Sequence, residues 1–275
     1  MGEHQAKPTS ERVTVEAYQS TLGDYLIYLF HVATYEFARS YVKGRRVLDF
    51  GCGTGYGTHA LASAATAIEG IDISTDAIAH ARGHFEAENL TFRVVEPVDV
   101  KPLPFDDGSF DTVVSFQVIE HISGVDSYLD EIRRVLAPGG VLVCATPDRT
   151  TRLFQRQRPW NLHHVHEYAP NELEALLAGT FPVVEMFGMT APEDLLRHEL
   201  RRTHKLRLLT LPFTFPGAPE KVRAGGLGVM KWIEARRAPS AAETPGTAHD
   251  FGAEVIQIEP DAHPSVNIVA VARLR

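Results

Sequence analysis

The sequence predicts an α/β fold in which helices cover both faces of a mostly parallel sheet. Two observations lead to this prediction. Between residues 46 and 187, short apolar segments typical of buried strands alternate with alanine-rich or amphipathic segments typical of helices. In addition, the first apolar segment opens directly into a glycine-rich turn and a helix, an arrangement that places free N–H groups beside a bound ligand.

The composition restricts the class of protein. The chain has 275 residues, 44% hydrophobic and 23% charged, which suits one large globular domain with appendages. The net charge of −8 and the absence of a long Lys/Arg block argue against a nucleic-acid partner. No apolar run reaches the roughly 18 residues of a membrane span, and residues 1–20 are too polar for a signal peptide. With Cys52 and Cys144 in predicted buried segments, we expect a cytoplasmic protein with reduced thiols.

The N-terminal region, residues 1–43, is predicted to form a helical cap. Tyr18, Tyr25, Tyr28 and Tyr35 are spaced by seven, three and seven residues, which places them on one helical face. Two interpretations are open at this point. The face is either a stripe of the core or a cap over the active site, with phenol groups available to a substrate.

The glycine-rich turn lies in residues 46–57, which read R-V-L-D-F-G-C-G-T-G-Y-G. Alternating glycines let the backbone take positive φ and approach a ligand closely. The dinucleotide fingerprint G-x-G-x-x-G is not met, because Tyr56 or Thr58 stands where its third glycine would be. The phosphate-loop pattern is also missing. The turn therefore predicts a ligand close to the backbone, and which ligand is a separate question.

The second predicted strand, residues 67–73, ends in an acid. Asp72 lies 17 residues after Gly55, where a βαβ unit brings the tip of its second strand beside the first turn. A carboxylate at this point can accept hydrogen bonds from both ribose hydroxyls of a nucleoside. The alternative is an acid that stabilises the start of the next helix, but Asp76 already fills that role.

Two stretches of this chain resemble a known family. D-F-G-C-G-T-G-Y-G resembles the first motif of class I S-adenosylmethionine-dependent methyltransferases, and D-V-K-P-L-P-F-D-D-G-S-F-D-T-V-V-S-F-Q-V-I-E-H-I resembles small-molecule methyltransferases of the ubiquinone-biosynthesis type. The resemblance implies a Rossmann-like, seven-stranded fold with S-adenosylmethionine as cofactor. It also implies that Asp99 binds the adenine amino group and that the N–H of Val100 meets a ring nitrogen. The expected cofactor-binding residues are Asp49, Gly51, Gly53, Gly55, Asp72, Ile73, Asp99, Val100, Ser115 and Gln117.

The remaining segments complete the predicted domain organisation. An amphipathic helix over residues 125–136 stops before a Pro-Gly-Gly turn, and strands follow at residues 141–145, 181–187 and 266–271. The predicted core is residues 44–190 with 265–275. Residues 191–264 form an insertion with helices at 195–211 and 229–237 and a linker at 238–252. This insertion is expected to be an acceptor lid or a contact in a homo-oligomer.

A histidine-rich segment follows the fifth strand, with three histidines and a glutamate in residues 163–167. Their spacing fits no helical zinc pair and the two cysteines do not complete a set, so no metal is expected. The resemblance places this segment beside the acceptor pocket, ahead of a helix whose start Asn171 and Glu174 would cap. The expected catalytic residues are His163, His166, Glu120 and His121, with a structural role open for the last two; the expected substrate-binding residues are Tyr18, Tyr25, Trp160 and His164.

The family resemblance implies methyl transfer to a small molecule, a natural product or a sugar-type metabolite, with S-adenosylhomocysteine as the second product. Oxygen or nitrogen is the favoured acceptor atom, and a C-methyltransferase acting on an aromatic molecule is the alternative. Two hypotheses from other classes remain open, a nicotinamide-dependent oxidoreductase and a non-catalytic cofactor-binding protein.

Overall fold

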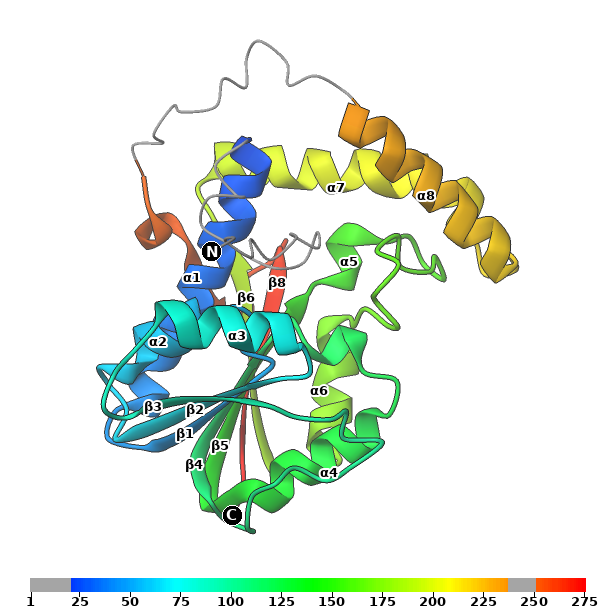
Figure 1. Cartoon of the computed structure of the whole chain (residues 1–275). Helices are drawn as coiled ribbons and strands as arrows, with labels where there is room; N and C mark the ends of the chain where they lie inside the picture. The colour runs from blue at the N-terminus through cyan, green and yellow to red at the C-terminus, as the bar shows by residue number, and fades with distance from the viewer. Residues whose placement is uncertain (1–20, 237–250) are drawn as a thin grey trace, which may run out of the picture.

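The computed structural model describes residues 21–236 and 251–275 and contains one eight-stranded sheet of order β3-β2-β1-β4-β5-β8-β6-β7 (Figure 1). The strands are β1 (Arg46–Phe50), β2 (Ala67–Asp72), β3 (Leu90–Val94), β4 (Phe110–Phe116), β5 (Leu136–Pro147), β6 (Val183–Thr190), β7 (Gln257–Pro260) and β8 (Asn267–Arg273). Strands β1 to β5 pair in parallel, and β8 lies antiparallel between β5 and β6. The predicted α/β class is confirmed.

The sheet has one strand more than the seven predicted. The extra strand, β7, pairs antiparallel with the outer side of β6. It spans only four residues and ends in Pro260. Proline lacks an N–H donor and is tolerated in strands mainly at sheet edges, so the local sequence carries little strand signal.

Helices lie on both faces of the sheet (Figure 1). On one face are α1 (Leu22–Val42), α2 (Tyr56–Ala62) and α3 (Thr75–His84); on the other are α4 (Val125–Val135) and α6 (Pro170–Ala178). Beyond the carboxyl ends of the parallel strands lie the short α5 (Arg149–Arg152) and the long helices α7 (Glu193–Thr214) and α8 (Glu220–Arg236) (Figure 1). Two single turns of 3₁₀ helix, η2 (Ile119–His121) and η3 (Ala253–Val255), complete the described elements.

The core divides into two layers because side chains alternate across a strand. Val114 and Val143 point toward α1 and α2, whereas their neighbours Val113 and Leu142 point toward α4 and α6. All four side chains are fully buried. Burial on both faces explains why these strands read as continuous apolar runs and not as alternating ones.

Two helix starts differ from the sequence prediction. Helix α6 begins after Ala169 with Pro170 in its first turn, and the Glu172 carboxylate accepts the N–H of Ala169, so the predicted cap by Asn171 and Glu174 is wrong. Proline at the first helical position is pre-organised for a helix, because its missing N–H would be unpaired there anyway.

Helix α8 begins at Glu220, well before the predicted start at residue 229. The first part of this helix contains three glycines, whose low helix propensity hides it from a sequence-based prediction. One of them has a packing role. A β-carbon on Gly226 would lie 2.2 Å from a ring carbon of Phe213 in α7, so the close approach of the two helices requires glycine. Within residues 21–236 and 251–275, none of the helices combines the length and apolarity needed to cross a membrane.

Candidate active site

The glycine turn lies between β1 and α2 at the carboxyl edge of the sheet. Gly51, Gly53 and Gly55 have φ values of 82°, 54° and 85°, in the left-handed region that favours glycine. A β-carbon on Gly51 would lie 2.4 Å from Val118, so the turn packs tightly against the loop after β4. A β-carbon on Gly53 would meet nothing within 4 Å. The open space above Gly53 is the room that a cofactor lying against the backbone requires.

Asp49 lies beneath this turn with 0% exposure. Its Oδ2 accepts hydrogen bonds from the Tyr35 hydroxyl at 3.2 Å and the Thr58 hydroxyl at 2.6 Å, whereas its Oδ1 has no partner among the described residues. Burial raises the pKa of Asp49 to about 7, against the opposing effect of the two hydroxyl donors. A buried carboxylate oxygen left free beside the turn fits the positively charged amino acid part of S-adenosylmethionine.

The tyrosines of α1 have different roles from those expected. Tyr35 is buried against Gly57 and its hydroxyl holds Asp49, so it supports the turn from below. Sequence reasoning missed this contact, although the tyrosine spacing indicated one face. Tyr25 donates to the carbonyl oxygen of Phe251 at 2.7 Å and is not among the residues that line the cavity described below, so its expected substrate role stays a prediction. Tyr18 lies outside the described residues.

Asp72 lies beside the glycine turn, at the end of β2. One carboxylate oxygen accepts the N–H of Gly53 at 3.0 Å, and the other accepts the N–H of Ser74 at 2.8 Å. An ionised carboxylate has about four lone-pair sites, so two remain for a ligand. The next side chain, Ile73, is 64% exposed at the same edge. An exposed apolar side chain next to a ribose-type acid suits the flat face of a base.

The loop after β3 carries the residues expected to meet adenine. Asp99 is exposed and lies against the backbone of Gly124, where a β-carbon would be 3.2 Å from its own β-carbon. The N–H of Val100 already donates to the carbonyl oxygen of Pro97 at 2.9 Å. A ring nitrogen at this N–H would therefore share or replace an existing bond.

The end of β4 separates two residues that the sequence analysis grouped together. Ser115 is 1% exposed, donates to the Phe50 carbonyl at 3.1 Å and accepts from the Tyr128 hydroxyl at 2.8 Å. Both of these hydrogen bonds are internal and connect Ser115 to β1 and α4, so its expected contact with the cofactor stays a prediction without support from this geometry. Gln117 adopts a φ of 57°, rare for a residue other than glycine, and lines the adjoining cavity.

A cavity of about 360 Å³ lies at the carboxyl ends of β4 and β5. Its walls come from α1, the turn after β4, the loop after β5, and helices α7 and α8. The lining residues are Ile27, Phe30, His31, Gln117, Glu120, His121, Pro147, Arg152, Trp160, Asn161, Leu162, His163, His164, Glu199, Arg202, Leu206, Thr210, Leu227, Met230, Val266 and Asn267. The lining is mixed, with nine apolar residues and twelve polar or titratable ones, so the cavity offers hydrogen-bonding groups as well as apolar surface to a small molecule. A wider and more open hollow of about 630 Å³ lies along α3 and β3, away from every predicted site residue.

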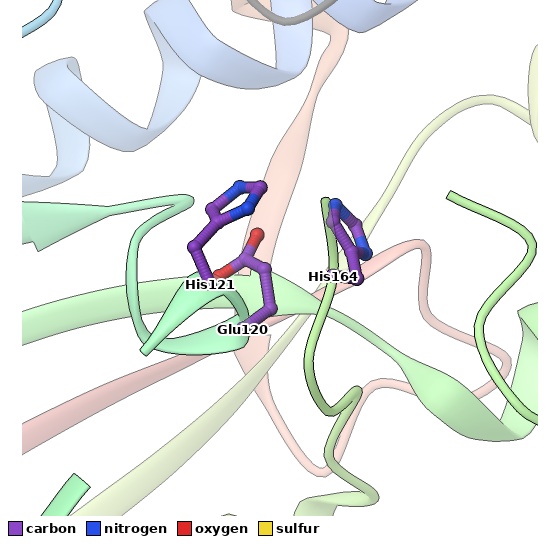
Figure 2. A group of neighbouring side chains, drawn as sticks. All are labelled: Glu120, His121 and His164. Atoms are coloured by element: carbon purple, nitrogen blue, oxygen red, sulfur yellow. The ribbon is translucent and has the colours of Figure 1, made fainter. Parts of the chain in front are cut away.

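Three chemically active side chains converge on this cavity, as Figure 2 shows: Glu120 and His121 from the turn after β4, and His164 from the loop after β5. Glu120 is 0% exposed, and burial raises its pKa to about 8. Its Oε2 accepts from the Thr146 hydroxyl at 3.0 Å. His121 Nδ1 lies 3.0 Å from the carbonyl oxygen of His163.

A buried ion pair holds His164 in place. Its Nδ1 lies 2.7 Å from Glu167, whose carboxylate accepts from Arg152 at 3.0 Å. Although burial opposes ionisation, Arg152 and His164 lower the pKa of Glu167 to about 2. The Arg152 guanidinium lies 4.3 Å over the ring of Trp160, which lines the cavity.

The other histidines near the cavity differ in their access to it. The Nε2 of His166 lies 2.7 Å from Glu172 at the start of α6, and His166 is not among the residues that line the cavity, so its expected catalytic role stays a prediction without support from this geometry. His31 does line the cavity and was missed. Its desolvated surroundings lower its pKa to about 4, so it is neutral at neutral pH.

Comparison with known sequences agrees with this geometry. Residues 48–144 match a family model described as a methyltransferase domain. A probable S-adenosylmethionine-dependent methyltransferase of Mycolicibacterium smegmatis is 35% identical over 160 residues, which cover 58% of this chain and 60% of the relative. A ubiquinone biosynthesis O-methyltransferase of Maricaulis maris is 30% identical over 112 residues, covering 41% and 44%. The chain thus spans less than two thirds of the length of either relative.

Solved structures share the fold at low sequence identity. An S-adenosylmethionine-dependent methyltransferase of Mesorhizobium loti superposes with a TM-score of 0.52 at 17% identity, covering 89% of this chain and 99% of the other. The [4+2]-cyclase SpnF also gives 0.52, at 18% identity, covering 88% and 81%. Because one fold hosts different reactions, these likenesses establish architecture and not chemistry. The matched domain at residues 48–144, the sequence relatives and the shared fold together support a class I S-adenosylmethionine-dependent methyltransferase.

Proposed function

We propose that this protein methylates an oxygen or nitrogen atom of a small molecule bound in the cavity beside Gln117 and Glu120. The observation that supports this most is the position of the cavity. The loop after β4 lines it through Gln117, and the next residue, Val118, packs directly against Gly51 of the glycine turn. The cofactor turn and the acceptor cavity therefore share one wall.

The residues present fit S-adenosylmethionine. The open backbone at Gly53, the free oxygen of Asp49 and the remaining lone pairs of Asp72 offer groups for its methionine and ribose parts, and Ile73 and Asp99 flank the place for its base. When bound, this cofactor supplies a methyl group on a sulfonium, which is a good leaving group. The protein then contributes mainly alignment and exclusion of water.

The acceptor side is formed by elements outside the sheet. Helices α7 and α8 contribute Leu206, Leu227 and Met230 to the cavity wall. We therefore assign the insertion to an acceptor lid in preference to an oligomer contact. An acceptor hydroxyl or amine also needs a base within hydrogen-bond reach. His163 reaches the cavity and is suited to this role, as is His121 while its Nε2 is free, whereas burial lowers the pKa of His31 to about 4 and makes it a weak base.

Formation of S-adenosylhomocysteine with a panel of phenols, sugars and amines tests this proposal. Trp160→Leu removes an aromatic wall and should lower turnover at least about tenfold while S-adenosylmethionine affinity stays within about threefold, a loss of transition-state stabilisation. Trp232→Leu is the matched control, because Trp232 is 55% exposed on α8 and does not line the cavity. Tight cofactor binding without product from any acceptor would favour the non-catalytic alternative. Products methylated only at carbon would support C-methylation.

A further inference from the structure

We infer that Glu120, His121 and His164 bind a divalent first-row transition-metal ion, of the Zn²⁺ type, at the wall of the acceptor cavity. Each side chain offers one ligand atom, and the three atoms lie within 4.8 Å of one another. Figure 2 shows that they extend into the same space from two separate segments of the chain. The histidine-rich run was considered for metal binding from sequence alone, but this set takes only one histidine from it.

The carboxylate of Glu120 has one oxygen available to bind a cation. The side chain is 0% exposed, and Oε1 has no hydrogen-bond partner among the described residues. The other oxygen, Oε2, is fixed by the Thr146 hydroxyl at 3.0 Å. A buried polar atom without a partner keeps the cost of its desolvation, so natural structures rarely leave one without a function or a bound group.

Both histidines are oriented as metal-bound histidines are. The Nδ1 of His121 faces a carbonyl oxygen of His163, which has no proton to give, so Nδ1 must carry the hydrogen. The Nδ1 of His164 likewise faces the Glu167 carboxylate at 2.7 Å. In a neutral imidazole this leaves the lone pair on Nε2. A ring whose other nitrogen donates to a carboxylate or carbonyl is typical of metal ligands, because that bond fixes the tautomer and raises ligand basicity.

The donor set decides which kind of ion fits. Two imidazole nitrogens and one carboxylate oxygen suit Zn²⁺ and its first-row neighbours, whereas Mg²⁺ and Ca²⁺ prefer oxygen ligands. At metal–ligand distances of about 2.0–2.2 Å, tetrahedral ligands lie roughly 3.4 Å apart. From separations of up to 4.8 Å, the ligand atoms need to approach one another by as much as about 1.4 Å when the ion binds. Three protein ligands leave a further position open, as in catalytic zinc sites.

The open position gives the ion a role that rests on the proposed function. All three ligands line the acceptor cavity, so the hydroxyl oxygen of an acceptor can take the open position. Coordination lowers the pKa of a bound hydroxyl. The O–H bond then breaks with its electron pair kept by oxygen, and the proton passes to water. The inference therefore specifies the acceptor as a hydroxyl compound that can chelate or coordinate a divalent ion.

Metal binding is tested on the full chain, stripped with a chelator and titrated with Zn²⁺ and, separately, with Co²⁺ for its visible absorption. We expect one equivalent bound and no comparable binding of Mg²⁺. Glu120→Gln, which preserves volume, and His164→Ala should each weaken binding at least 100-fold. Glu167→Gln, which acts through His164, should weaken it 10- to 100-fold. His166→Ala is the matched control from the same segment and should bind as the wild type does, because His166 pairs with Glu172 outside the cavity.

The inference is overturned if the folded wild type binds no equivalent of either ion, or if Glu120→Gln and His164→Ala bind as tightly as His166→Ala. Thermal unfolding of each variant establishes that lost binding is not lost folding. Failure of the proposed function looks different. In that case the metal binds with the expected variant pattern and S-adenosylmethionine binds, yet no acceptor is methylated.

Discussion

Substitution of Asp72 gives the most direct test of the cofactor site. Its carboxylate already accepts the N–H groups of Gly53 and Ser74 at 3.0 and 2.8 Å, so it is held in place beside the turn. Two further lone-pair sites remain for the ribose hydroxyls. Hydrogen bonds to a charged group are worth about 1.5–3 kcal/mol each. Losing one such bond corresponds to roughly a 10- to 100-fold weaker Kd, and losing two to as much as about 10⁴-fold.

Asp72→Ala should therefore weaken S-adenosylmethionine binding by at least about tenfold in isothermal titration calorimetry. Asp72→Asn keeps one acceptor oxygen and should fall between Asp72→Ala and the wild type. Asp76→Asn is the control, since Asp76 lies in the first turn of α3, beyond the strand end that contacts the glycine turn. Thermal unfolding without cofactor measures how much of any loss comes from the bond to Gly53. Unchanged affinity in Asp72→Ala would refute the ribose assignment.

Three further predictions concern the turn and the buried charges. Gly53→Val should abolish cofactor binding because φ is 54° and the new side chain would occupy the open space, whereas Gly83→Ala should bind normally in the same titration. With a pKa of about 7 in the folded protein, Asp49 binds its proton more tightly than in the unfolded chain. The free energy of unfolding, measured with urea, should therefore fall as the pH rises from about 4 to about 7. In Asp49→Asn the free energy of unfolding should depend less on pH over this range. Arg152→Met should lower the free energy of unfolding by about 3–5 kcal/mol in the same urea titration, because buried Glu167 loses the guanidinium that balances its charge and keeps only His164; a second substitution, Glu167→Gln, should recover part of the loss.

Elements defined by neighbouring residues could be predicted from the sequence. The strand, glycine turn and helix at residues 46–62 were predictable from the apolar run and the alternating glycines, whose φ values are positive in the structure. The position of Asp72 beside this turn was predictable from the length of a βαβ unit. Secondary-structure predictions were wrong where the local preference of the residues disagrees with the packing of the whole fold. The glycines of α8 lower its predicted helix propensity, yet Gly226 allows the helix to pack closely against Phe213. The short segment β7 forms a strand because it pairs with the outer edge of β6.

The sequence by itself predicted the fold class and the resemblance to methyltransferases, because these depend on short-range patterns of residue type. Only the tertiary structure decided which side chains meet. It brought Tyr35 onto Asp49, moved Tyr25 and His166 out of the cavity, and joined His164 to Glu120 and His121. These contacts join segments that lie far apart in the chain. Which face of a helix or loop turns toward them is set by packing across the whole core, which no local pattern encodes.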